Sequence, residues 1–184
     1  MPETMPEEPG HGSDPGLEQL NALTGEELRA RLAQCLDVDR WVASLAALAP
    51  FRDRDELMRG ADDHARAITP EEVATALARH PRIGEKAEGT GTEARWSRGE
   101  QSAFAADTDD ASARVQRIFA HAQREYEDRF GHIYLVCASG RSSRELLADL
   151  VARLGNDTAT ELRVVADELR RIAGLRLAKL LGNP

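Results

Sequence analysis

The sequence predicts an all-α protein, a single-domain bundle of roughly seven to nine helices with one buried extended segment near residues 133–138. Helix-forming Ala, Leu, Arg and Glu dominate the composition, and aromatic residues make up only 4% of it. Helix start signals follow one another closely from residue 17 onward, and no segments pair up as the strands of a sheet. The length of 184 residues suits one compact domain.

The first sixteen residues predict a flexible N-terminal tail, because they are rich in Pro, Gly, Glu and Ser and have no apolar periodicity. A single all-α domain is expected to follow over residues 17–184. Its first clear start signal is the pair Thr24 and Glu27, which has the spacing of a capping box. Leucines at helical spacing then continue one apolar face.

Three further helix starts follow within the next fifty residues. Asp39 is expected to cap a short helix that Pro50 ends, and Asp53 with Glu56 is expected to open the next one. Residues 69–72, Thr-Pro-Glu-Glu, carry the clearest signal of the chain. They combine a capping residue, a proline at the first helical position and acidic residues in the first turn.

The helix that starts there is expected to stop near His80, because Pro81 disfavours helical geometry in the residue before it. Residues 81–94 hold three glycines and no apolar rhythm, so they predict a loop of about 14 residues. Loops of this length inside a compact domain are often functional. Ser97 and Glu100 have capping-box spacing and are expected to open the next helix.

A long amphipathic helix is predicted after Asp109, closing at Phe130 and Gly131, where the glycine can take the left-handed conformation. The run Ile-Tyr-Leu-Val-Cys-Ala at 133–138 fits either a buried extended segment or the start of a helix. Its β-branched and aromatic residues and the flanking glycines favour the extended form. The last two helices are expected to start at the pairs Ser142–Glu145 and Thr158–Glu161.

Charge and cysteine content limit the class of function. The net charge of −8 argues against non-specific nucleic-acid binding and against attraction to anionic membranes. Cys35 and Cys137 are too few for a disulfide scaffold and lack the spacing of a zinc site. The longest apolar run, 133–138, is far too short to cross a bilayer, and the chain opens on no secretion signal. We therefore expect a cytoplasmic protein with no nucleic-acid or membrane partner.

Arg176 does not fit a purely structural interpretation of the last helix. It lies four residues after Ile172 and seven after Leu169, so it falls on the apolar stripe and points into the domain. Buried arginines are rare unless they are paired. Two interpretations remain open. In the structural one, Arg176 pairs with a structural carboxylate or snorkels at the helix end. In the functional one, its guanidinium holds a planar anion.

His80 and the pair Ser97–Glu100 also invite a functional interpretation. His80 lies on the core side at the C-terminal end of its helix, whose partial negative charge favours protonated imidazole and proton exchange near neutral pH. The alternative is a capping or core histidine. For Ser97 and Glu100 the alternatives are a helix cap and a buried carboxylate facing His80, and spacing alone favours the cap.

Several stretches occur in the order and near the spacing of one family: residues 50–51, 80–85, 96–97 with 100–101, 130–131 followed by 133–138, and 172 with 175–177. Together they resemble the 2-oxo-4-hydroxy-4-carboxy-5-ureidoimidazoline (OHCU) decarboxylase family, and Arg-Ile-Gly-Glu at 82–85 resembles its bacterial form. The resemblance implies a helical bundle that is usually a homodimer. It further implies a carboxy-lyase that decarboxylates this small ureidoimidazoline to (S)-allantoin in urate degradation, with no metal or organic cofactor.

The resemblance also implies which residues act. His80 would be the catalytic acid/base, Glu100 its carboxylate partner and Arg176 the group that grips the substrate. The remaining positions would line the substrate, the last five of them largely through backbone: Pro81, Ser97, Gln101, Tyr134, Leu135, Val136, Cys137 and Ala138.

Two rival functions remain open. The first is a non-catalytic helical interaction module in which His80 and Arg176 only satisfy buried carboxylates; it predicts that the three candidate catalytic side chains do not converge on one pocket. The second is a metal-dependent hydrolase using His80, Glu85 and His64, although the histidines show no compact metal-ligand spacing.

Overall fold

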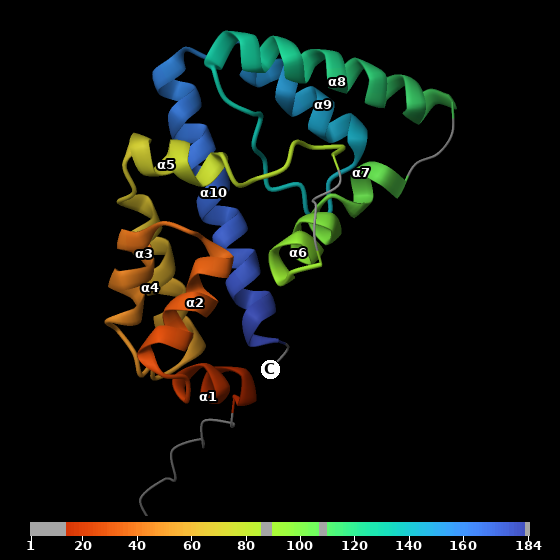
Figure 1. Cartoon of the computed structure of the whole chain (residues 1–184). Coiled ribbons are helices and arrows are strands. Elements are labelled where there is room, and N and C mark those ends of the chain that lie inside the picture. Colours follow the sequence, from red (N-terminus) through yellow and green to blue (C-terminus); the bar gives the residue numbers. More distant parts are fainter. Residues whose placement is uncertain (1–13, 86–89, 107–109, 183–184) are drawn as a thin grey trace, which may run out of the picture.

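The computed structural model describes residues 14–85, 90–106 and 110–182, which form ten α-helices and contain no strand (Figure 1). The helices are α1 Pro15–Asn21, α2 Gly25–Cys35, α3 Asp39–Ala46, α4 Arg54–Arg66, α5 Pro70–Leu77, α6 Thr92–Glu100, α7 Ser102–Ala106, α8 Asp110–Phe130, α9 Ser143–Arg153 and α10 Thr158–Leu181. The all-α prediction is confirmed. The described residues hold one helix more than the upper end of the expected range, and both α1 and the five-residue α7 lack a start signal identified above.

Most of the predicted helix starts are confirmed. Thr24, Thr69 and Ser142 each form a complete capping box with the glutamate three residues later. Asp53 accepts a hydrogen bond from the backbone N–H of Glu56. Gly131 ends α8 with a φ of +75°, in the left-handed region that favours glycine.

Three predicted caps are wrong. Val38 rather than Asp39 is the N-cap of α3, and α10 is capped by Asp157, which accepts from the N–H of Thr160. Helix α6 begins after Gly91, so Ser97 lies inside the helix. A spacing of three residues fits a capping box but also one face of a helix, and in α6 it marks the buried face. The predicted tail over residues 1–16 lies outside the described residues up to position 13, and α1 begins at Pro15, capped by Asp14.

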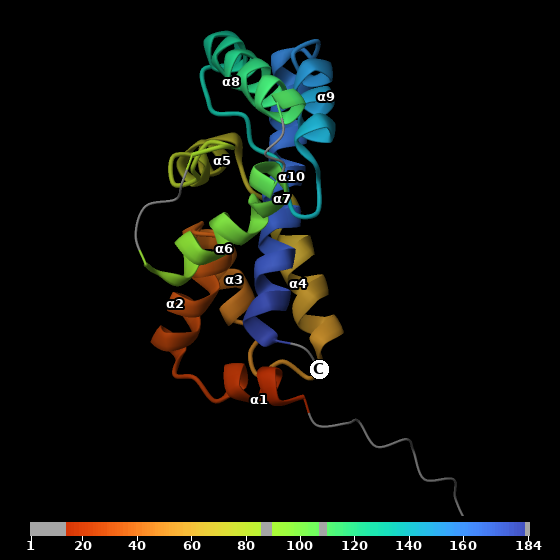
Figure 2. The same ribbon diagram turned by 90° about the vertical axis from the view of Figure 1, so that its right-hand side faces the viewer.

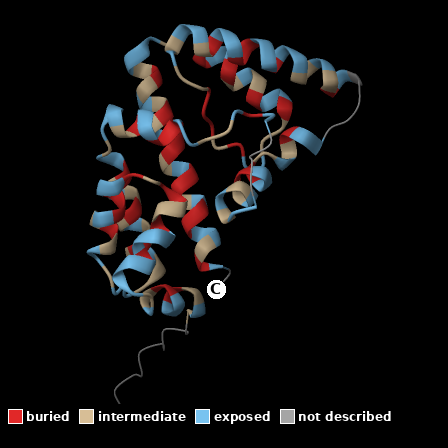
Figure 3. Ribbon diagram, viewed as in Figure 1, coloured by how far each residue is buried: buried red, intermediate tan, exposed pale blue. Residues whose placement is uncertain are grey.

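Helix α10 runs the length of the molecule (Figures 1 and 2), and the buried apolar residues form two hydrophobic clusters. Helices α1, α2, α4 and α5 pack against α10, and together with α3 they form the first cluster. The second cluster lies between α7, α8 and α9, with Phe119, Leu146 and Leu150 at its centre. Figure 3 shows that the helix faces turned toward these clusters are buried.

The segment 133–138 has neither helical nor strand structure, as predicted, and it lies between the two clusters. Its odd-numbered residues pack into or against the first cluster and its even-numbered residues belong to the second. Side chains satisfy its backbone, since Arg153 Nη1 donates to the carbonyl of Leu135 (2.8 Å) and Glu168 Oε2 accepts from the N–H of Cys137 (2.8 Å).

A buried ionic group holds this segment from the α9 side. Glu161 has no exposed surface, and it accepts hydrogen bonds from Arg153 Nε (2.8 Å) and Nη2 (2.6 Å). The hydroxyl of Tyr126 and the side-chain amide of Asn156 also donate to Glu161. Because the acid is fully bonded, its charge is tolerated in the interior.

Candidate active site

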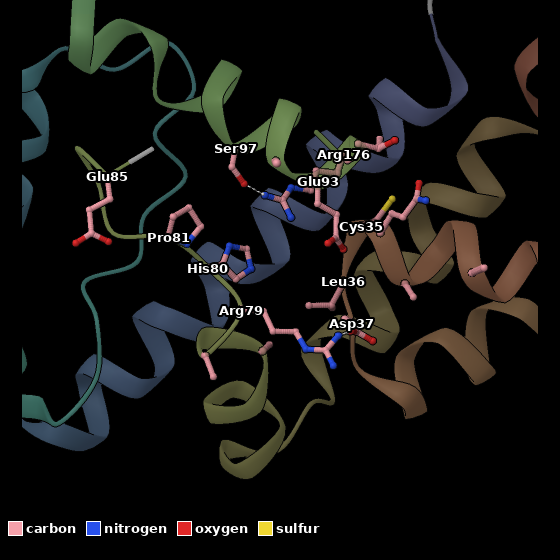
Figure 4. Close-up of a pocket in the computed structure, with 18 residues that line it drawn as sticks. Cys35, Leu36, Asp37, Arg79, His80, Pro81, Glu85, Glu93, Ser97 and Arg176 are labelled. Carbon is pink, nitrogen blue, oxygen red and sulfur yellow. Dashed lines mark hydrogen bonds and ion pairs between the residues drawn. The ribbon is translucent and has the colours of Figure 1, made fainter. Parts of the chain in front are cut away.

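A cavity of about 770 Å³ opens between α2, the turn after α5, the first part of α6 and one side chain of α10 (Figure 4). Its volume falls within the range of about 300–1,000 Å³ typical of small-molecule sites. His80, Pro81, Ser97 and Arg176 are among the lining residues. Four of the residues singled out in the sequence therefore share one concave surface, although they come from three distant parts of the chain.

His80 lies beyond the helix rather than on its last turn. Helix α5 ends at Leu77, and the N–H of His80 donates to the carbonyl of Leu77 (3.1 Å) in the turn that leads to Pro81. Burial and the nearby charge of Arg176 lower the pKa of His80 to about 4, although Glu100 acts in the opposite direction. The protonated imidazole that a helix end was expected to favour is therefore absent at neutral pH, because the effect of burial exceeds the attraction of a helix end. His80 is neutral at pH 7.

Arg176 points into the domain as predicted and is only 5% exposed. Its Nε donates to Glu100 Oε1 (3.1 Å), and its Nη2 donates to Glu100 Oε2 and to Ser97 Oγ (both 3.0 Å). Its Nη1 donates to no described residue. The guanidinium is thus fixed on one edge while one amino group stays available at the cavity.

Glu100 lies behind Arg176 and is not among the residues that line the cavity. The residue is 8% exposed, and its carboxylate also accepts from Lys179 Nζ at 3.4 Å. Burial works to raise the pKa of Glu100, but the hydrogen bonds and charges of Arg176 and Lys179 outweigh it and hold the pKa below its usual value. Glu100 is therefore an ionised partner of the guanidinium, and the cap that spacing favoured is absent.

The other predicted substrate-lining residues lie outside the cavity wall. Gln101 holds the loop after Pro81, accepting from the N–H of Gly84 (3.0 Å) and donating to the carbonyl of Arg82 (3.3 Å). Tyr134, Leu135, Val136 and Ala138 are buried between the two clusters, and Cys137 is half-buried. The charge of Glu100 reaches the Cys137 thiol, so the segment passes near the site without lining it.

One wall of the cavity was missed in the sequence. It comes from α2 and the linker after it, where Ala30, Ala33, Gln34 and Asp37 lie at helical spacing beside the apolar stripe. Asp37 pairs with Arg79, the residue before His80, at the edge of the cavity. The sequence does carry a stripe of small and polar residues next to the apolar stripe of this helix. That pattern does not identify a cavity wall, because exposed helix faces show it too.

Within the described residues, no group of three or more His, Cys, Asp or Glu side chains is placed to hold a metal ion. No helix of the described part of the chain has the length and apolarity needed to cross a membrane.

Comparisons with known proteins identify relatives across nearly the whole chain. The family model described as OHCU decarboxylase matches residues 21–178. The chain is 27% identical to the 2-oxo-4-hydroxy-4-carboxy-5-ureidoimidazoline decarboxylase of Haloferax volcanii, covering 89% of this chain and 94% of the relative. It is also 27% identical to the protein of the same name from Amia calva, covering 91% and 95% of the two chains.

Two further matches are part of a longer protein and a solved structure. The chain is 28% identical to part of the uric acid degradation bifunctional protein TTL of Arabidopsis thaliana, covering 81% of this chain and 46% of that protein. Among solved structures, an OHCU decarboxylase crystallised in the presence of (S)-allantoin superposes with a TM-score of 0.68 at 26% identity. That match covers 88% of this chain and 100% of the other.

Proposed function

This chain belongs to the OHCU decarboxylase family, and we propose that it is a carboxy-lyase that decarboxylates OHCU to (S)-allantoin in urate degradation. The observation that carries the proposal is the shared cavity of His80 and Arg176, with Glu100 bound directly behind the guanidinium. A non-catalytic interaction module predicts that these side chains do not converge, so the geometry favours the enzyme.

The chemistry of the substrate explains why a small set of side chains suffices. The reacting ring carbon bears a hydroxyl and a carboxylate and is next to a carbon–nitrogen double bond. When carbon dioxide leaves, its electron pair moves toward that double bond, and the ring nitrogen takes up a proton from solvent. The ring is its own electron sink, so the protein needs to supply only orientation, charge placement and a directed proton transfer.

Arg176 orients the anionic substrate in this proposal. Its Nη1 donates to the bound anion, while Glu100 and Ser97 hold the other edge of the guanidinium in place. Glu100 then acts as a positioning residue, since its carboxylate is occupied by two cations behind the cavity wall. Pro81 and Ser97 contribute wall surface.

His80 moves the proton. Because it is neutral at pH 7, its imidazole accepts the proton of the substrate hydroxyl and then returns a proton to the ureido-bearing carbon from one face. General acid–base help of this kind contributes roughly 10²–10⁴-fold in rate. Gln101 and the segment from Tyr134 to Ala138 contribute by shaping the loop and the backbone beside the site.

The decisive experiment generates the unstable substrate in situ from urate with the two upstream enzymes and follows (S)-allantoin by circular dichroism. We expect the chain to accelerate formation of the S enantiomer, and His80→Ala to remove most of the acceleration while the helical spectrum stays unchanged. His64→Ala is the matched control, since His64 lies on α4 away from the cavity. Near-normal turnover by His80→Ala would refute the assignment.

We also infer that the chain forms a homodimer and acts in the cytoplasm. The dimer is what the family resemblance implies, and the cytoplasmic location is what the free thiols of Cys35 and Cys137 favour, since they suit a reducing compartment. Sedimentation velocity over a range of protein concentrations tests the dimer, and fractionation of the source cells tests the compartment.

A further inference from the structure

The cavity has a second polar side that the proposed mechanism does not use. Glu93 lies in the first turn of α6 and lines the same cavity as His80 and Arg176. Figure 4 shows its carboxylate directed into the space beside Arg176, Cys35 and Leu36. No ion pair or hydrogen bond joins Glu93 to another described residue, so its oxygens are available as acceptors.

Gln34 adds an acceptor from the α2 wall. Its Oε1 is buried and receives no hydrogen bond from any described residue. A buried carbonyl oxygen without a partner is costly unless a ligand or ordered water satisfies it. Because Gln34 also lines the cavity, a bound ligand with N–H groups is the partner that its position suggests.

Acceptors and donors therefore lie on separate parts of one cavity. Arg176 is already paired with Glu100, and among the described residues no ion pair joins it to Glu93. The charges of Arg176 and Glu93 both act on the Cys35 thiol, which places the cation and the acid around the same region. A ligand that fits must carry an anionic group that binds Arg176 and N–H donors that bind Glu93.

We propose, on the basis of the proposed function, that Glu93 and Gln34 form the side of the cavity that binds the ureido group of substrate and product. A ureido group presents several N–H donors, and a carboxylate can accept two of them at once. A ligand with a second carboxylate in place of the ureido group is rejected by Glu93 through charge repulsion.

This assignment gives the pair a role in stereochemistry. The ureido-bearing carbon is the atom that receives the proton from His80. With the anionic group on Arg176 and the ureido group on Glu93, the ring is held at two points and only one of its faces is turned to the imidazole. Glu93 is thus a specificity-determining residue and not a proton carrier.

The test uses isothermal titration calorimetry with (S)-allantoin and with hydantoin, which has a similar ring and no ureido group. Wild-type protein should bind (S)-allantoin more tightly than hydantoin. Glu93→Gln should weaken (S)-allantoin binding about tenfold and leave hydantoin binding within about twofold. Gln34→Met should show the same selectivity with a smaller loss.

Glu85→Gln is the matched control. It removes the same charge from the same cavity, but Figure 4 shows Glu85 directed away from His80 and Arg176. We expect it to bind both ligands as the wild type does. Equal losses for both ligands in Glu93→Gln, or no loss, would overturn the inference while the proposed function stands. Failure of the wild-type protein both to bind (S)-allantoin and to accelerate its formation would overturn both.

Discussion

Substitution of Glu100 by Gln tests the pairing on which the site geometry depends. The carboxylate receives two hydrogen bonds from Arg176 and a third contact from Lys179, and both members of the main pair are almost fully buried. Glutamine keeps the shape but presents an NH₂ group where an acceptor is needed. The guanidinium then remains buried without its counter-charge.

The size of the effect follows from burial. Removing one partner of a buried ion pair costs about 3–5 kcal/mol, and the retained amide oxygen places Glu100→Gln near the lower end, at about 3 kcal/mol. Arg176→Met should cost a similar amount, because Glu100 keeps only Lys179. The double variant removes both charges, so its cost should fall about 2 kcal/mol short of the sum.

Urea unfolding followed by circular dichroism gives the free energy of unfolding for all four proteins of this cycle. All three variants should lose most of the decarboxylase activity, because none presents a correctly held guanidinium. If the two single substitutions add within about 0.5 kcal/mol, the side chains are not coupled and the site geometry described above is wrong.

Three other predictions follow from the same structure. The unfolded chain binds a proton on His80 near pH 6.5, and the folded chain binds it only near pH 4. The free energy of unfolding should therefore fall by about 3 kcal/mol as the pH drops through this window. His80→Gln should show a shallower fall in urea titrations. Arg153→Met leaves the fully buried Glu161 without its cation and should lower the free energy of unfolding by about 3–5 kcal/mol, whereas Arg52→Met at an exposed pair should cost less than about 1 kcal/mol. Burial raises the pKa of the Cys35 thiol to about 12, so iodoacetamide at pH 8 should label it far more slowly in the native protein than in urea, as measured by mass spectrometry; equal rates would contradict the burial.

The fold was largely predictable because most helix ends depend on hydrogen bonds between residues that are close in the sequence. Thr69 with Glu72, and Ser142 with Glu145, satisfy backbone groups within their own helix turn, so neighbouring residues suffice to locate them. Ser97 with Glu100 has the same spacing but bonds to Arg176, almost eighty residues later in the chain. Only the folded structure distinguishes the two cases.

The site was predictable where a residue broke an apolar pattern or matched a family stretch, as Arg176 and His80 do. The protonation state of His80 was not, because burial and the charge of Arg176 arise only when distant segments meet. Glu93 and Gln34 were missed for a related reason: each occupies a position that, taken alone, fits a solvated helix face.

Side chains along residues 133–138 face the two hydrophobic clusters in alternation, and this pattern fixes the number of residues in the segment as well as their type. Each side chain there faces the cluster opposite to that of its neighbours. Deleting one residue would shift the register and exchange the two faces, so that the ring of Tyr134 would be driven toward the cluster that Leu135 now fills. The segment therefore tolerates only its present number of residues, and an insertion or deletion within it would disturb the packing of both hydrophobic clusters.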